Sequence, residues 1–416
     1  MRCCDSGSTS CLSPRPCGTS CTGTGDLRIL LTNITLASRS GTEINIRDIA
    51  TGLLARGHRP IVYSTRLGEI AEEIRAATVP VVDDLARVGI APDVIHGHHH
   101  PETMTALLHF PGVPAIFFCH DWMGWHDSPP CFPRIRRYVA VDDTNRDRLV
   151  LEHGIPEERV RVILNSVDLG RFQPRAPLPS RPGCALVFSH YAREDAGLGI
   201  VRTACARAGL ALDVVGDGVG RPVTRPETIL GAYDLVFARG RCALEALAVG
   251  AAVVLCGTAG MGPMVTSVEL DRLRRSNLGR RCLRAPLAVE RLEREIARYD
   301  AGDAARVSER IRATAGLADQ LDTLVALYEE VIGEAGRAGP SDAAAEGRAA
   351  AAYLRLWSPL LDGRVRAERD FYRAECERLR AERDERKALL DANWWKFPRR
   401  TFRRWRRARR HRRALE

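Results

Sequence analysis

The chain has 416 residues, of which 45% are hydrophobic and 27% charged, an ordinary composition for a soluble globular protein of two domains. No apolar run approaches the ~20 residues that a membrane-spanning helix needs, which excludes a protein that crosses a bilayer by such a helix. The formal net charge of +10 belongs to the C-terminus, because eleven of the 62 basic residues and one of the 52 acidic residues lie between Trp394 and Glu416.

Residues 1–25 are rich in Cys, Ser and Gly and lack the apolar segment of a signal peptide. We therefore expect a disordered leader, or a start codon placed too early. Five of the 13 cysteines fall here, with spacings that fit no zinc site. The other eight are scattered singly, as expected for reduced thiols in a cytoplasm.

Residues 26–175 alternate short apolar runs with amphipathic stretches such as Gly41–Arg56, which stops at Gly57 as it would at a C-cap. This alternation implies parallel strands with right-handed crossovers, a doubly wound sheet. The predicted strands are Leu27–Leu31, Pro60–Ser64, Val79–Val82, Val94–His96, Ala115–Phe118, Tyr138–Val141 and Val160–Leu164.

A proline-rich hinge follows, FQPRAPLPSRPG from Phe172, and the alternation then resumes over 176–335. Two Rossmann-like domains facing each other place a binding cleft at the carboxyl ends of their strands. Residues 336–392 are read as a linker and a helical segment, and 393–416 as a basic aromatic tail. The predicted elements of the second domain are strands Ala185–Ser189, Ala211–Val215, Asp234–Ala238 and Ala252–Leu255, helices Glu194–Ala208, Cys242–Val249 and Val265–Arg275, and a mostly helical Leu287–Gly333.

The first motif is SGTE, Ser40–Glu43, at the predicted start of a helix. Gly41 has no Cβ, so a ligand can approach the backbone closely, and the helix that follows presents free N–H groups. The alternative is structural: Ser40 caps the helix, and Glu43 completes a capping box. A GxGxxG fingerprint is missing, which weakens a dinucleotide interpretation.

The second motif is GRCALEALAVGAAVVLCG, which runs from Gly240 between two predicted strands. The helix N-terminus at Gly240 can hold a diphosphate through N–H groups and the helix dipole, aided by Arg239 and Arg241. Glu245 lies about one turn further on, among small apolar residues. A carboxylate there can accept both hydroxyls of a ribose, whereas the alternative is a surface glutamate satisfied by water.

These motifs, in their order along Leu27 to Gly333, resemble the group 1 glycosyltransferases (glycosyltransferase family 4) of the two-Rossmann GT-B fold. The resemblance implies a nucleotide-diphosphate-sugar donor held mainly by the second domain, a glycan or lipid-linked acceptor held mainly by the first, and no separate cofactor. Glu245 matches the family's ribose-binding glutamate, Gly41 its loop glycine near the donor phosphates, and Gly216 and Gly218 a loop that contributes to base selection. The similar segments are SGTEINIRDIATGLLARGHRPIVYS, DVIHGHHH, VRVILNSVDLGRFQP, LDVVGDGVG and the Glu245 helix.

The chain departs from the family pattern at two places. The family's second glutamate, eight residues before the ribose glutamate, is Phe237 here. The family's Arg and Lys after the first strand of the second domain correspond to His190 and to Asp195 or Ala196. Arg193 is then the candidate for the charge that the leaving diphosphate requires.

Histidines form the third feature. HDW, His120–Trp122, follows a predicted strand and resembles the family's acceptor-side histidine, which can hydrogen-bond the donor sugar or help to deprotonate the acceptor hydroxyl. The alternative is a histidine that caps a loop. In the run His96–His100 successive side chains point in different directions, so few can share one ion, and we expect no metal. The sequence has no Asp-x-Asp pair that would chelate a metal-bound diphosphate.

The tail interleaves Trp394, Trp395, Phe397, Phe402 and Trp405 with arginines, the composition of a segment that lies in a membrane interface. It also resembles the Trp–Arg motif that ends many polysaccharide-assembly transferases. RNA binding or a merely solvated charge run are the alternatives. The helical composition of Val365–Leu390, just before it, gives only weak support for a coiled coil.

The sequence therefore predicts a metal-independent glycosyltransferase of hexosyl type, peripheral on the cytoplasmic face of the cell membrane, with no nucleic-acid partner. The family resemblance implies retention of configuration. Two alternatives stay open: a degenerate transferase that binds nucleotide-sugar or glycan without transfer, and a nucleotide-sugar epimerase of similar fold. Turnover of a donor distinguishes an active transferase from the degenerate one. Formation of an altered nucleotide-sugar without any acceptor identifies the epimerase.

Overall fold

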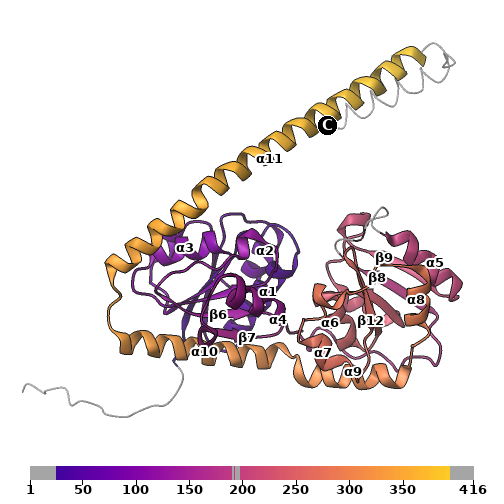
Figure 1. Ribbon diagram of the computed structural model, residues 1–416, viewed down its shortest axis with the longest axis horizontal. Helices are drawn as coiled ribbons and strands as arrows, with labels where there is room; N and C mark the ends of the chain where they lie inside the picture. The colour runs from indigo at the N-terminus through magenta and orange to yellow at the C-terminus, as the bar shows by residue number, and fades with distance from the viewer. Residues whose placement is uncertain (1–24, 190–191, 193–196, 394–416) are drawn as a thin grey trace, which may run out of the picture. The chain divides into compact units, whose positions relative to one another are not determined.

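The structure is a computed structural model, and it describes residues 25–189, 192 and 197–393. The chain divides into two compact units, residues 1–341 and 342–416. The first unit contains two α/β domains, each built on its own sheet (Figure 1).

The first sheet has seven parallel strands in the order β3-β2-β1-β4-β5-β6-β7. The central strands β1, β4 and β5 are buried along almost their whole length, as expected for a parallel sheet that is covered on both faces. The strand order reverses between β1 and β4, the position where a ligand crevice opens in such sheets. The strands are β1 Arg28–Thr32, β2 Arg59–Tyr63, β3 Val81–Val82, β4 Val94–His98, β5 Ala115–Cys119, β6 Ile135–Ala140 and β7 Val160–Val162.

The second sheet has five strands in the order β12-β11-β10-β8-β9, and β12 alone among them is antiparallel. Its order reverses at β8, so this domain also has a crevice at the carboxyl ends of its strands. The strands are β8 Cys184–Phe188, β9 Ala211–Val215, β10 Leu235–Ala238, β11 Ala252–Gly257 and β12 Gly260–Met264.

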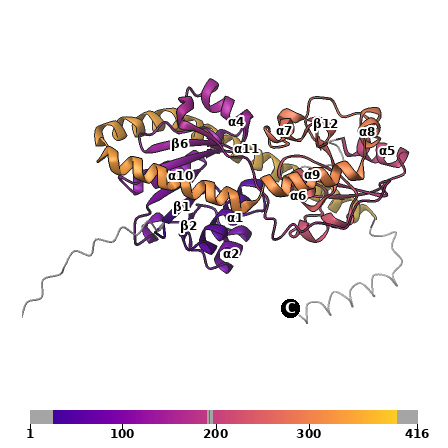
Figure 2. The same ribbon diagram turned by 90° about the horizontal axis from the view of Figure 1, so that it is seen from below.

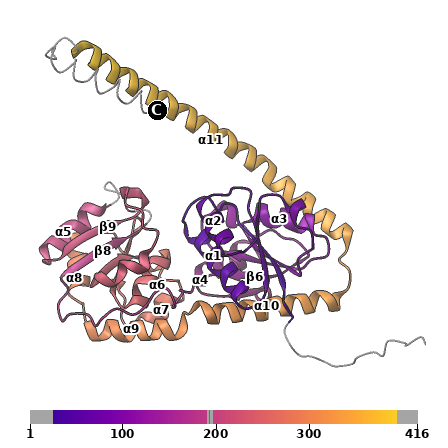
Figure 3. The same cartoon turned by 180° about the vertical axis from the view of Figure 1, so that it is seen from behind.

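Helices connect the strands and cover both sheets. Helix α1 ends within a residue of the predicted position, because Gly57 just after it takes a left-handed φ of +84°. Helix α6 ends in the same way at Gly250, with φ +101°. From behind, α5 and α8 lie together on the second domain (Figure 3). The helices of this unit are α1 Gly41–Ala55, α2 Glu69–Ala76, α3 His100–His109, α4 Asp143–Asp147, α5 Gly199–Arg207, α6 Gly240–Val249, α7 Leu270–Arg274, α8 Val289–Ile296, α9 Ala301–Thr314 and α10 Leu317–Ala338.

The last two helices of this unit serve different domains. Helix α9 packs on α6 of the second domain, whereas α10 returns to the first domain and packs on α1, β4 and β5 (Figure 2). Leu321, Leu324 and Tyr328 of α10 are buried in the core of the first sheet. The predicted domain range 176–335 groups α10 with the second sheet, although its apolar face joins the first.

The strand predictions agree with the structure to within a few residues, and the GT-B-like arrangement of two parallel α/β domains is confirmed. Two predictions in the second domain need correction. Strand β12 was missed, because its sequence GMGPM contains Gly and Pro, which disfavour a strand and are tolerated at a sheet edge. The helix predicted over Val265–Arg275 is confined to α7, because Ser267 instead hydrogen-bonds the carboxylate of Asp303.

The second unit, described as far as Asn393, contains the helix α11, Ala343–Asn393. The helical reading of Val365–Leu390 is confirmed over this range. Along α11 the side chains of Phe371, Tyr372 and Leu379 are exposed to solvent. None of the helices in the described part of the chain has the length and apolarity to span a bilayer. The leader 1–24 and the tail 394–416 lie outside the described residues.

Candidate functional site

A cleft of about 640 Å³ lies where the carboxyl ends of both sheets meet. Residues that directly follow β1, β4, β5, β8 and β10 line it, as expected for a ligand site between two Rossmann-like domains. Among the predicted site residues, the cleft brings together Gly41 and His120 from the first domain and Arg239, Gly240 and Arg241 from the second.

The SGTE segment forms one wall of the cleft at the N-terminus of α1. A Cβ added to Gly41 would meet nothing within 4 Å, so the backbone is open to a ligand at this point. Ser40 makes no side-chain cap hydrogen bond, and its hydroxyl instead donates to the buried carboxylate of Glu43, as does that of Thr42 at 2.9 Å. The capping box that the sequence offered as an alternative is therefore wrong.

The opposite wall is the N-terminus of α6. Gly240 takes φ +57°, a left-handed conformation that glycine adopts without strain, and a Cβ there would also meet open space. Its N–H donates to the carbonyl of Leu278 at 2.9 Å. Arg239 lines the cleft beside it. Two helix N-termini, with their positive dipole ends, therefore open into one cavity.

Glu245 is buried within α6 and accepts a hydrogen bond from Arg241 Nε at 2.8 Å. Arg241 also donates to Asp48 of α1, which in turn pairs with Arg47 at 2.7 Å. Burial alone would raise the pKa of Asp48, but Arg241 and Arg47 outweigh it and lower that pKa. For Glu245, burial is the largest effect and, with a smaller contribution from Asp48, outweighs Arg241 and Arg171 and raises the pKa. The predicted ribose acceptor and phosphate ligand are thus paired with each other.

The structure does not place the remaining predicted donor residues among those that line the cleft. Gly216, with φ +148°, and Gly218 flank Asp217, which lines the cleft, but neither glycine is among the lining residues. Arg193 lies outside the described residues, as does His190. Phe237 of β10 is buried in the core of the second domain, where it lines a separate small cavity and not the cleft; this position is a glutamate in the family that the chain resembles.

His120 ends a chain of hydrogen bonds that begins deep in the first domain. Tyr328 Oη lies 2.5 Å from His96 Nδ1, His96 Nε2 lies 2.8 Å from His98 Nε2, and His98 Nδ1 lies 2.6 Å from His120 Nε2. Burial lowers the pKa of His96 to about 3 and that of His120 to about 4, and holds that of His98 well below its usual range. All three imidazoles are therefore neutral at pH 7, with one proton each.

The direction of this chain follows from its buried end. His96 is the hydrogen-bond partner of Tyr328 among the described residues, so donation from the phenol to His96 Nδ1 is the arrangement that leaves no buried O–H unsatisfied. His96 then donates from Nε2 to His98, and His98 donates from Nδ1 to His120 Nε2. The lone pair of His120 Nε2 is used, and the ring proton lies on Nδ1. His120 can donate a hydrogen bond to a sugar or phosphate oxygen, but it is not placed to accept a proton.

A second polar group in the cleft comprises His99, His126 and Asp127, which place one potential ligand atom each within 4.8 Å of one another. A histidine that binds a metal must offer a lone pair. His99 Nδ1 accepts from the backbone N–H of Ile34 at 3.1 Å, so the proton of this neutral ring lies on Nε2. Nε2 is therefore a donor, and the group does not fit a metal ion. That the protein acts without metal stays a prediction.

Asp127 was missed at the sequence level, because it lies in a loop where no spacing or neighbouring motif distinguishes it. It ends the 3₁₀ helix Trp125–Asp127, is 1% exposed, and accepts from the backbone N–H of His120 at 3.3 Å through Oδ1. Burial raises its pKa to about 7. A buried carboxyl group with a raised pKa that lines a cleft is a candidate functional group.

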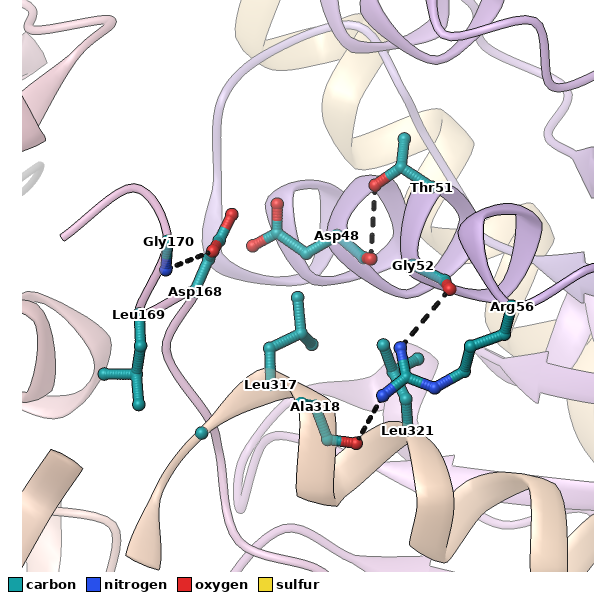
Figure 4. A pocket seen from close by; sticks show the side chains of 11 residues that line it. Asp48, Thr51, Gly52, Arg56, Asp168, Leu169, Gly170, Leu317, Ala318 and Leu321 are labelled. Atoms are coloured by element: carbon teal, nitrogen blue, oxygen red, sulfur yellow. Dashed lines mark hydrogen bonds between the residues drawn. The ribbon is translucent and has the colours of Figure 1, made fainter. Parts of the chain in front are cut away.

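A separate cavity of about 330 Å³ lies at the start of α10 (Figure 4). Arg56 spans one side of it and donates to the carbonyls of Gly52 and Ala318. Asp168 is committed to the N–H groups of Gly170 and Arg171 within its own turn. None of the predicted site residues lines this cavity. It marks the junction of α1, the segment after Ser166 and α10.

Comparison with known proteins agrees with this geometry. Residues 39–171 match the sequence model of Glycosyltransferase Family 4. A glycosyltransferase from Rickettsia africae ESF-5 superposes with a TM-score of 0.53 at 14% identity, over 74% of this chain and 99% of that one. At this identity the likeness shows the fold, which is GT-B. The match and the fold support a glycosyltransferase.

Other solved structures are less similar. The lipopolysaccharide outer core galactosyltransferase WaaB has a TM-score of 0.47 at 11% identity, over 73% of this chain and 100% of that one. MurG of Acinetobacter baumannii has a TM-score of 0.45 at 10% identity, over 73% and 99%. In sequence, no curated protein matches the chain.

Proposed function

We propose that this protein transfers a hexosyl group from a nucleotide-diphosphate-sugar to a hydroxyl of a glycan or lipid-linked acceptor, in glycan or polysaccharide biosynthesis. One observation carries the proposal: two helix N-termini, at Gly41 and Gly240, open from opposite domains into the same cleft. A diphosphate between them is stabilised by N–H groups and dipoles without a metal. The acceptor oxygen bonds to the anomeric carbon, and the nucleoside diphosphate leaves.

Arg239 provides the positive charge in the cleft that the leaving diphosphate requires, with Arg241 behind it. Glu245 binds the ribose once a ligand draws Arg241 away from it. The family resemblance implies retention of configuration, which the anomeric proton of the product reports by NMR.

The donor site is tested by calorimetric titration of UDP, GDP and ADP and their 2′-deoxy analogues into the full chain and the Glu245→Ala variant. We expect micromolar binding of one nucleotide, weakened about tenfold, or ~1.4 kcal/mol, in Glu245→Ala. In the variant, the ribo- and deoxy-nucleotides should bind equally, because the ribose partner is gone. Glu290→Ala, an exposed glutamate on α8, serves as the matched control.

Two outcomes count against the proposal. If a folded sample binds no nucleotide or nucleotide-sugar, the transferase assignment fails. If the deoxy analogue binds as tightly as the ribonucleotide in the unaltered protein, Glu245 is not the ribose acceptor.

A second candidate is a protein that binds nucleotide-sugar without transferring the sugar. The observations that favour it are the buried Phe237 and the engagement of Arg241 by two carboxylates. Release of nucleoside diphosphate from the nucleotide-sugar that binds decides between the two candidates.

The basic tail 393–416, whose residues 394–416 lie outside the described part, is proposed to hold the enzyme on the cytoplasmic face of the membrane. Each basic residue contributes on the order of 1 kcal/mol at an anionic surface. The full chain should sediment with phosphatidylglycerol-containing vesicles at low salt, and a chain ending at residue 392 should not. Equal sedimentation of both would remove the membrane proposal.

A further inference from the structure

Two buried polar atoms in the cleft lack a hydrogen-bond partner among the described residues: Asp127 Oδ2 and His99 Nε2. Both side chains are 1% exposed, and both residues line the cleft. A buried polar atom without a partner costs on the order of 1–3 kcal/mol, and such atoms in native structures call for an explanation. A ligand that fills the cleft would provide one.

The two atoms offer complementary hydrogen-bonding groups. His99 Nε2 carries the ring proton, because Nδ1 accepts from Ile34, and it is therefore a donor. Asp127 Oδ2 is an acceptor. A hydroxyl group needs one donor and one acceptor, since it both accepts and donates a hydrogen bond. The pair thus fits a hydroxyl better than a phosphate, which the carboxylate would repel.

The other candidate for deprotonating an acceptor is His120, and its hydrogen-bonded environment disfavours that role. Its Nε2 already accepts from His98, and its ring proton occupies Nδ1. A base on the acceptor side must therefore be another group. Glu43 also lines the cleft, but Oε2 of its carboxylate already accepts from Ser40 and Thr42.

We propose that Asp127 and His99 bind the acceptor hydroxyl and that Asp127 is the base that removes its proton. His99 Nε2–H donates to the acceptor oxygen, and the hydroxyl donates to Asp127 Oδ2. As the oxygen bonds to the anomeric carbon, its proton passes to Asp127 and the bond to the nucleoside diphosphate breaks. The inference rests on the proposed transfer reaction. Because Asp127 acts on the acceptor oxygen, its proposed role does not determine whether the configuration at the anomeric carbon is retained.

The charges around Asp127 suit this role. Burial raises the pKa of Asp127 to about 7, Asp121 adds to the rise, and Arg148, from the helical segment after α4, opposes it. His126 Nε2 lies 3.7 Å from Oδ2. A base with a pKa near the working pH combines an ionised ground state with a useful driving force for proton transfer.

The test uses the full chain and whichever nucleotide-sugar binds in the titration above. Release of nucleoside diphosphate is measured with water alone and with n-octyl β-D-glucopyranoside as acceptor probes, from pH 6 to 8.5. Asp127→Asn should slow turnover by about 10²–10⁴-fold, the usual contribution of a positioned base, with the donor's dissociation constant unchanged. Asp127→Glu should recover part of the rate, and Asp83→Asn, a surface aspartate paired with Arg87, is the matched control.

The pH profile gives a second readout that a structural role would not produce. The unaltered protein should lose activity as the pH falls through about 7, because the base becomes protonated, whereas the residual activity of Asp127→Asn should be flat there. Turnover of Asp127→Asn within threefold of the unaltered protein, or a profile unchanged by the substitution, overturns the assignment. If the unaltered protein binds a donor but releases no nucleoside diphosphate, the transfer reaction itself fails, and the inference fails with it.

Discussion

Five histidines in and behind the cleft, His96, His98, His99, His100 and His120, make the stability of this protein sensitive to mild acid. Burial holds the pKa of His98 and His99 well below the ordinary value, that of His96 and His100 at about 3, and that of His120 at about 4. In the unfolded chain each histidine titrates near pH 6.5. Below that pH the unfolded state binds protons that the folded state excludes, so stability falls as the pH falls.

Buried carboxyl groups oppose this effect, Asp127 and Glu102 most strongly among them. Burial raises the pKa of both Asp127 and Glu102 to about 7, so below that pH the folded state binds protons that the unfolded state does not. Five protons taken up on unfolding and two released leave a net uptake of three near pH 5. At about 1.4 kcal/mol per proton and pH unit, the free energy of unfolding should fall by about 4 kcal/mol per unit. Small domains have only about 5–15 kcal/mol in total.

Urea unfolding followed by tryptophan fluorescence and circular dichroism, at pH values from 7.5 to 5, measures this slope. Two variants should move it in opposite directions. His100→Gln removes one histidine that binds a proton only in the unfolded state, and should lower the slope to about 3 kcal/mol per pH unit. Asp127→Asn removes one carboxyl group that binds a proton only in the folded state, and should raise the slope to about 5 kcal/mol per pH unit. Thr105→Ala, on the exposed side of α3, should leave it unchanged. A free energy of unfolding that stays constant or rises between pH 6 and 5 would refute the reasoning.

Three further predictions concern the cleft. Asp48→Asn should lower the free energy of unfolding by about 3 kcal/mol, because it removes a carboxylate that compensates the charge of the buried Arg241. Urea titration measures the loss, with Asp322→Asn, at an exposed aspartate, as the control. A loss under 1 kcal/mol would contradict the prediction. Gly240→Ala should lower the free energy of unfolding by about 1 kcal/mol, because Gly240 has a positive φ, whereas Gly41 does not and Gly41→Ala should have no such effect. The melting temperatures of the two variants test the difference. Donor turnover should survive excess EDTA, and restoration of lost activity by added Mg²⁺ or Mn²⁺ would argue for a metal.

The alternation of strands and helices could be predicted from the sequence, because the buried strands of a parallel sheet are continuous apolar runs and glycines mark the ends of α1 and α6. The position of α10 could not be predicted. Its apolar face would satisfy either sheet, and only the three-dimensional path of the chain after α9 brings Tyr328 beside His96. The prediction that His120 faces the cleft is consistent with the structure, yet the direction of its hydrogen bonds depends on that distant tyrosine.

The pairing of Arg241 with Glu245 shows why a site residue can be predicted while its state cannot. The i,i+4 spacing places both side chains on one face of α6, where an arginine and a glutamate attract each other whether or not a ligand binds. Asp48, which completes the network, lies 193 residues from Arg241 in the sequence, and no local sequence pattern predicts their contact. A nucleoside diphosphate offers a phosphate to Arg241 and ribose hydroxyls to Glu245, so binding would exchange one internal pair for two ligand contacts. A nucleoside offers only the second contact and would leave the arginine competing for Glu245; it should therefore bind far more weakly than the loss of the phosphates alone implies.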